Sequence, residues 1–220
     1  MSDRDALAHA IQVMARLRAP GGCPWDREQT HQSLAKYAIE EAHEVAEAAE
    51  NHDMAGLREE LGDLLLQVLF HAQIAHEAGA FSLDDVATGL VDKLTRRHPH
   101  VFGEGTASTP EQVEENWDAI KQQENPGSHP LDDIPATLPA LMRAQKVISR
   151  AQKANLPVVD HLDLVNPDQH RPYDSNTAGD IGNELLGLVW RANQAGVDAE
   201  QALRHATRAL RAALDSPRTS

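Results

Sequence analysis

The sequence contains one cysteine, few aromatic side chains and no long apolar run. A single thiol, Cys23, excludes an internal disulfide framework and any zinc site built from several cysteines. Because no stretch approaches the roughly 18 to 20 uncharged apolar residues of a membrane span, an integral membrane protein is excluded. The first residues alternate charged with apolar side chains and lack the apolar core of a signal peptide. We therefore expect a cytoplasmic protein.

Basic residues are also scarce, since 20 Lys and Arg stand against 34 Asp and Glu, a net charge of −14 with histidine neutral. Duplex-binding proteins carry a basic surface, so we expect no stable nucleic-acid binding. A strongly acidic protein can still bind polyphosphates when cations bridge the two. The phosphate-binding loop GxxxxGKS/T and the nucleophile elbow GxSxG are both absent. Their absence argues against a P-loop NTPase and an α/β-hydrolase.

Helix-forming residues dominate what is present. Ala, Leu, Glu, Gln and Arg are frequent, whereas aromatic residues make up 4% of the chain. This composition and the helical spacing of apolar side chains predict an all-α fold, with a bundle of four to five helices in residues 1–124. Capping and stop signals predict helices at 4–18, 30–50, 54–76, 82–97 and 109–124. A loop at 21–29 separates the first two.

The remaining sequence indicates a linker and a second, smaller helical region. The Pro- and Gly-containing residues 125–137 form the linker. The segment DIGNELLGLVW at 180–190 resembles ELGDLLLQVLF at 60–70, and each is followed by a glycine turn and a capped helix. We therefore interpret 138–214 as a degenerate second copy of the first region. This region comprises helices at 138–154, 178–194 and 199–213 and a loose proline-rich segment at 155–178. A tail at 215–220 follows it.

Four carboxylates have a spacing that suggests a metal site. Glu41 and Glu44 are three positions apart, so they share one face of a helix, and Glu60 and Asp63 repeat this spacing on the next helix. A short break joins the two helices, which should pack antiparallel and bring the four groups together. A hard divalent cation such as Mg²⁺ would neutralise their repulsion. The alternative is a solvated acidic face, and spacing alone leaves both open.

Other residues have a functional and a structural interpretation. Lys93, Arg96 and Arg97 share a helix face, where they either grip phosphates or complement the helix dipole. Trp25 and His31 flank the early loop, and they either stack on a base or anchor that loop.

An oxidative di-iron bundle is a weaker alternative. The sequence Glu40-Glu41-Ala42-His43 contains Glu-x-x-His, but such bundles require a second copy of that motif. Position 63, where the second histidine would stand, is Asp.

At these residues the sequence resembles the MazG family of nucleoside triphosphate pyrophosphohydrolases. The family pattern Glu-Glu-x-x-Glu, a spacer and Glu-x-x-Asp matches residues 40–44 and 60–63. The resemblance extends over about residues 5–124, through GGCPWDREQTHQSL, EELGDLLLQVLFHAQIA, KLTRRHPHVFG and NWDAIK. It implies hydrolysis of a nucleoside triphosphate to the monophosphate and pyrophosphate, with Mg²⁺ required and Mn²⁺ as a substitute. It also implies a homodimer.

The resemblance further assigns roles to individual residues. It implies that Glu40 and Glu41 serve catalysis, with Glu40 either supporting the metal ligands or orienting the attacking water. The implied metal ligands are Glu41, Glu44, Glu60 and Asp63. The implied phosphate-binding residues are Lys93, Arg96 and Arg97. His31 and Trp25, beside the early loop, are the other candidate substrate-binding residues.

The second copy has lost the residues of this pattern. Asp180 and Asn183 stand where Glu and Asp belong, and no Glu-Glu-x-x-Glu precedes them. We therefore expect no second active site. The competing interpretation of the whole chain is a non-catalytic acidic helical scaffold or regulatory binding protein. A scaffold would tolerate the loss of single carboxylates, whereas an enzyme would not.

Overall fold

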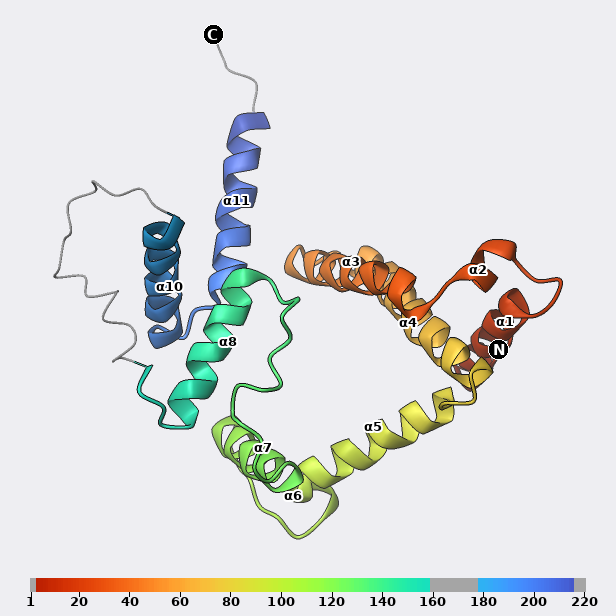
Figure 1. Ribbon diagram of the computed structural model, residues 1–220, viewed down its shortest axis with the longest axis horizontal. Coiled ribbons are helices and arrows are strands. Elements are labelled where there is room, and N and C mark those ends of the chain that lie inside the picture. Colours follow the sequence, from red (N-terminus) through yellow and green to blue (C-terminus); the bar gives the residue numbers. More distant parts are fainter. Residues whose placement is uncertain (1–2, 159–177, 216–220) are drawn as a thin grey trace. The chain divides into compact units, whose positions relative to one another are not determined.

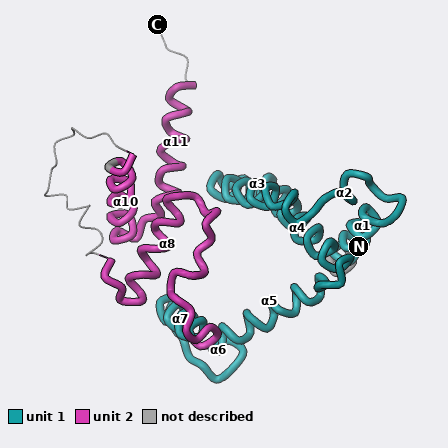
Figure 2. The backbone as a smooth tube through the Cα atoms, viewed as in Figure 1, with its two compact units in different colours: residues 1–122 teal, residues 123–220 magenta. Residues whose placement is uncertain are grey.

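A computed structural model describes residues 3–158 and 178–215, and within these ranges every regular element is a helix (Figure 1). The all-α prediction is confirmed. The chain divides into two compact units, Met1–Gln122 and Gln123–Ser220 (Figure 2). None of the described helices is long and apolar enough to cross a membrane.

The five long helices expected in the first region are all present, with ends within a few residues of those predicted. They are α1 (Asp3–Arg18), α3 (His31–Glu50), α4 (Met54–Glu77), α5 (Leu83–Arg97) and α7 (Pro110–Glu124). Two short helices were not predicted, α2 (Pro24–Glu28) in the expected loop and α6 (Pro99–Phe102) after α5. Each begins with a proline, whose fixed φ favours a first helical turn. Single turns are too short for a helical periodicity to show in the sequence.

Side-chain caps define where α3 and α4 begin. The Thr30 hydroxyl accepts the Ser33 N–H at 3.1 Å, and the Ser33 hydroxyl accepts the Thr30 N–H at 2.9 Å. Asp53 accepts the N–H groups of Ala55 and Gly56 at the start of α4. Between the helices, His52 adopts a left-handed φ of 56°. This tight turn makes α3 and α4 an antiparallel hairpin, as the sequence predicted.

A small apolar core joins α1 to this hairpin. Met14, Leu34, Leu69 and Phe70 are buried together, and Tyr37 packs against them. Burying each large apolar side chain is worth about 1.5 to 3 kcal/mol, so this cluster fixes the three helices against one another.

The outer faces of α4 and α5 are apolar and exposed. Eight large apolar side chains on these two helices are between 38% and 60% exposed in the single chain: Leu61, Leu65, Leu66, Val68, Val86, Leu90, Val91 and Leu94. An apolar surface of this kind marks an interaction site.

The second unit contains α8 (Ala140–Lys153), α10 (Ala178–Gln194) and α11 (Ala199–Asp215). Ile148, Ala151 and Val189 are its buried apolar residues. Asn193 joins α10 to α8, because its amide bonds with Ser149 and Gln152, each at 2.7 Å. The loose segment expected at 155–178 lies largely outside the described residues.

The two units share the local pattern that the sequence suggested. Gly79 after α4 and Gly196 after α10 both have a φ of +68°. Each turn is followed by a capping residue, Ser82 before α5 and Asp198 before α11.

Candidate active site

The α3–α4 hairpin brings three predicted carboxylates together. Glu41 on α3 and Glu60 and Asp63 on α4 each offer an oxygen within 4.8 Å of the others. Glu41 and Glu60 are half-buried. The convergence follows from the antiparallel packing, since residues one turn apart on each helix face the same seam.

Glu44 belongs to the same cluster. The pKa of Glu41 is raised, first by desolvation, then by the charges of Asp63, Glu44 and Glu40, and also by hydrogen bonding to Glu44. The pKa of Glu60 is likewise raised by desolvation, by the charge of Glu44 and by hydrogen bonding to it. The charges of the four predicted ligands therefore influence one another, and Glu40 lies beside them on α3.

The cluster fits a small, hard cation. All of its donors are carboxylate oxygens, which Mg²⁺ prefers, and a bound cation would offset the mutual repulsion that helps to raise the pKa of Glu41 and Glu60. Two oxygens on one Mg²⁺ lie at most about 4.2 Å apart, twice the usual bond length. The carboxylate oxygens lie within 4.8 Å of one another, so a small side-chain adjustment would bring them to that spacing.

The predicted phosphate-binding residues are placed elsewhere in the chain. Lys93 and Arg96 are exposed near the C-terminal end of α5, and Arg97 is half-buried. Figure 1 shows α5 leading away from the end of α4 rather than running back along it. Among the described residues, no basic group contributes to the pKa shifts of Glu41 and Glu60.

Trp25 and His31 both take part in contacts that the sequence did not reveal. The Trp25 ring is 52% exposed and stands edge-on to Tyr37 and Phe70, with centroids 6.4 and 6.3 Å apart. His31 stacks on His71, their Nδ1 atoms 2.8 Å apart. Both residues are therefore anchored, although Trp25 stays about half exposed.

Sequence reasoning missed the partners of these residues. Tyr37 lies four positions before Glu41, and that helical spacing could have placed it on the site face. His71 and Phe70 come from a different helix, and no local signal pairs them with residues 40 to 45 positions earlier.

Comparison with known proteins agrees with this geometry. The family model for the MazG nucleotide pyrophosphohydrolase domain matches residues 29–102, which include all four carboxylates. The nucleoside triphosphate pyrophosphohydrolase of Escherichia coli K12 is 41% identical over 212 residues, covering 89% of this chain and 81% of the relative. The chain belongs to the MazG family. It is accordingly an enzyme of that hydrolase family.

Two further MazG relatives support the assignment. A Thermotoga maritima protein named nucleoside triphosphate pyrophosphohydrolase/pyrophosphatase MazG is 39% identical over 207 residues, 90% of this chain and 80% of the relative. The nucleoside triphosphate pyrophosphohydrolase of Mycobacterium tuberculosis is 43% identical over 187 residues, 84% of this chain and 55% of the relative.

The second unit of this MazG protein offers no comparable cluster in its described part. Among the described residues, the only group of three acidic, histidine or cysteine side chains placed to hold a cation is that of Glu41, Glu60 and Asp63. Of the two described helices that contact α10, α8 makes the more extensive contact, and its sequence contains no Asp or Glu.

Proposed function

We propose that this MazG protein hydrolyses a nucleoside triphosphate to the monophosphate and pyrophosphate, and that Mg²⁺ is required. The convergence of Glu41, Glu60 and Asp63 in the region matched by the family model carries this proposal. The coupling of Glu44 to the same groups supports a fourth ligand. Mn²⁺ prefers similar oxygen ligands and should substitute.

The proposed roles follow from where the side chains lie. Glu41, Glu44, Glu60 and Asp63 hold the cation. Mg²⁺, when bound, offsets the charge of the triphosphate and so favours attack by water. Glu40 lies next to Glu41 and orients that water or accepts its proton. Water forms a new P–O bond, the bond between the α and β phosphates breaks, and pyrophosphate leaves. Trp25 and His31 contact the nucleoside.

The basic residues act, in this proposal, from a second copy of the chain. The exposed apolar faces of α4 and α5 are suited to pairing in a homodimer. Such a dimer would set Lys93, Arg96 and Arg97 of one chain beside the carboxylates of its partner. The phosphates would then be bound by basic residues of one chain and the cation by carboxylates of the other.

The decisive experiment is product analysis. The protein is incubated with each common nucleoside triphosphate and Mg²⁺, with and without EDTA, and the products are separated. The proposal predicts monophosphate and pyrophosphate, with EDTA abolishing their release. Diphosphate with orthophosphate would show that the wrong bond was assigned. Release of nothing from any substrate would favour the acidic scaffold.

Two variants test the carboxylates. Glu41→Gln keeps the size and hydrogen-bonding shape of the side chain but removes a ligand charge, so turnover should fall by at least about a hundredfold. Glu47→Gln is the matched control, because Glu47 is an exposed glutamate on the same helix, and its turnover should be unchanged. Full activity in Glu41→Gln would contradict the proposed site. Circular dichroism should show the same helix content in both.

Mixing two inactive variants tests the shared site. Glu41→Gln and Arg96→Ala proteins are each assayed alone and after unfolding and refolding together. In an interlocked dimer of one chain of each variant, one site combines the intact carboxylates of one chain with the intact basic residues of the other. Activity should therefore reappear on mixing. If each site is complete within one chain, the mixture remains as inactive as its components.

A further inference from the structure

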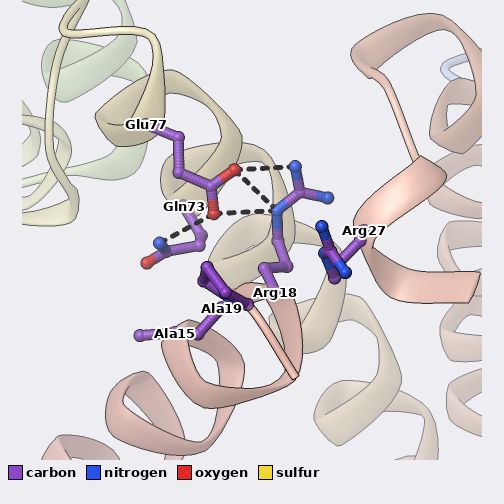
Figure 3. Close-up of a pocket in the computed structure, with 7 residues that line it drawn as sticks. Ala15, Arg18, Ala19, Arg27, Gln73 and Glu77 are labelled. Carbon is purple, nitrogen blue, oxygen red and sulfur yellow. Dashed lines mark hydrogen bonds and ion pairs between the residues drawn. The ribbon is translucent and has the colours of Figure 1, made fainter. Parts of the chain in front are cut away.

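The short helix α2 carries Trp25 but has little to hold it in place. None of its five residues is buried, and Cys23 at its start makes no side-chain cap. A cavity of about 460 Å³ opens beside it, between the end of α1, α2 and the end of α4 (Figure 3). Apolar burial, which fixes α1, α3 and α4 against one another, therefore does not fix α2.

One buried guanidinium connects α2 to its neighbours. The Arg18 side chain is only 7% exposed, and its Nη1 donates to the carbonyl oxygens of Asp26 and Gln29 at the end of α2. Its Nε and Nη2 donate to the Glu77 carboxylate at 2.8 to 3.1 Å (Figure 3). Gln73 donates to that carboxylate at 3.0 Å. Arg18, which ends α1, thus ties α2 to α4.

Arg18 also touches the ring on which Trp25 rests. Its guanidinium carbon lies 5.7 Å from the centre of the Phe70 ring, and Phe70 meets the Trp25 ring edge-on. Gln29 adds a second link, since its side chain donates to the Trp25 carbonyl and accepts from the Ser33 hydroxyl on α3. We call Arg18 together with Glu77 the Arg18 clamp. The backbone of Trp25, through Gln29, and the Phe70 ring beside Trp25 are therefore both linked to this clamp.

We propose that the Arg18 clamp is a positioning device for nucleotide binding, which holds the half-exposed Trp25 ring beside Tyr37. Tyr37 is one helical turn, about 6 Å, before Glu41, which leaves a nucleobase on Trp25 within reach of the carboxylates. The inference rests on the proposed function. Arg18 is a positioning residue, because it contacts the loop and not the substrate.

The kinetic test uses Arg18→Met, with Arg16→Met as the control. Arg16 is an exposed arginine on the same helix, two positions earlier, so its loss changes the charge but not the clamp. Arg18→Met should raise KM for the nucleotide about tenfold, as expected for loss of charged hydrogen bonds, and leave kcat nearly unchanged. Arg16→Met should change neither. A variant that merely unfolds would lower kcat instead.

Two further variants sharpen the kinetic test. Trp25→Ala should raise KM similarly, and the double variant with Arg18→Met should add little more, because both changes remove the same element. Arg18→Lys keeps the charge but cannot reach two carbonyls and a carboxylate together, so it should not restore KM. Additive effects, or full rescue by lysine, would overturn the clamp. If Arg18→Met does not fold, Glu77→Gln should raise KM in the same direction by a smaller factor.

A spectroscopic readout separates this inference from the proposed activity. The protein is labelled with 5-fluorotryptophan, and the ¹⁹F resonance missing in Trp25→Phe identifies Trp25. Arg18→Met should shift or broaden that resonance and leave the resonance of Trp190, in the second unit, unchanged. An unchanged Trp25 resonance would refute the clamp whatever the enzyme hydrolyses. Absence of turnover in the unmodified protein would refute only the proposed function.

Discussion

Neutralising one carboxylate of the acidic cluster should stabilise the metal-free protein. Glu41 and Asp63 offer oxygens within 4.8 Å of each other. Two unit charges at that distance repel by about 0.9 kcal/mol in a water-like dielectric, which suits this partly exposed site. Glu41→Gln removes this repulsion. For a chain of this size, about 1 kcal/mol corresponds to a rise in Tm of about 2 to 4 °C.

The same substitution should remove the stabilisation by Mg²⁺. A cation that binds only the folded chain adds about 2.7 kcal/mol at one hundred times its Kd. The unmodified protein should therefore gain about 5 to 10 °C in Tm between EDTA and saturating Mg²⁺. Glu41→Gln should start higher in EDTA and gain much less.

Thermal unfolding followed by circular dichroism measures both effects, with each protein examined in EDTA and in Mg²⁺. The exposed Glu47 again supplies the control, since Glu47→Gln should behave as the unmodified protein in both buffers. A scaffold with a solvated acidic face predicts small, parallel shifts for every carboxylate. Equal Mg²⁺ gains in Glu41→Gln and the unmodified protein would refute the metal site, even if the enzyme hydrolyses nucleotides.

Four other outcomes can be measured on separate variants. His52→Gly should raise the free energy of unfolding, measured with urea, by about 0.5 to 1 kcal/mol, and Gly79→Ala should lower it by about 1 kcal/mol, because both positions have a left-handed φ. Desolvation and the charge of His31 lower the pKa of His71, so stability should fall as pH drops below 6.5, and less so in His71→Gln. Asn183→Asp should leave turnover unchanged, and a large gain would disprove a dead second copy.

Local rules were enough to predict the hairpin and its carboxylates. Capping residues such as Thr30 and Asp53 act on N–H groups within three positions, so the sequence itself shows where the helices begin. The i, i+3 spacing of Glu60 and Asp63 likewise fixes a common face before any packing is known. The remaining step, that α3 lies antiparallel on α4, follows from the short turn.

Contacts between distant segments could not be predicted in the same way. Arg18 and Glu77 are 59 positions apart, and their pairing depends on how α1 crosses the end of α4. The position of α2 depends in turn on that pair. The sequence therefore left open whether Trp25 stacks on a base or anchors the early loop, and it did not indicate what would hold that loop.

The second unit keeps an apolar helix surface like that of α4 but lacks the acidic residues of the site. Ile181, Leu185 and Leu188 are exposed on α10, at the positions that Leu61, Leu65 and Val68 occupy on α4 when the two repeats are aligned. The apolar surface thus recurs in a helix that has lost its acidic pattern. A cation site needs carboxylates on two facing helices, and α8 provides none to α10. Restoring one ligand on α10 therefore cannot restore a site, because the missing part is an entire acidic helix.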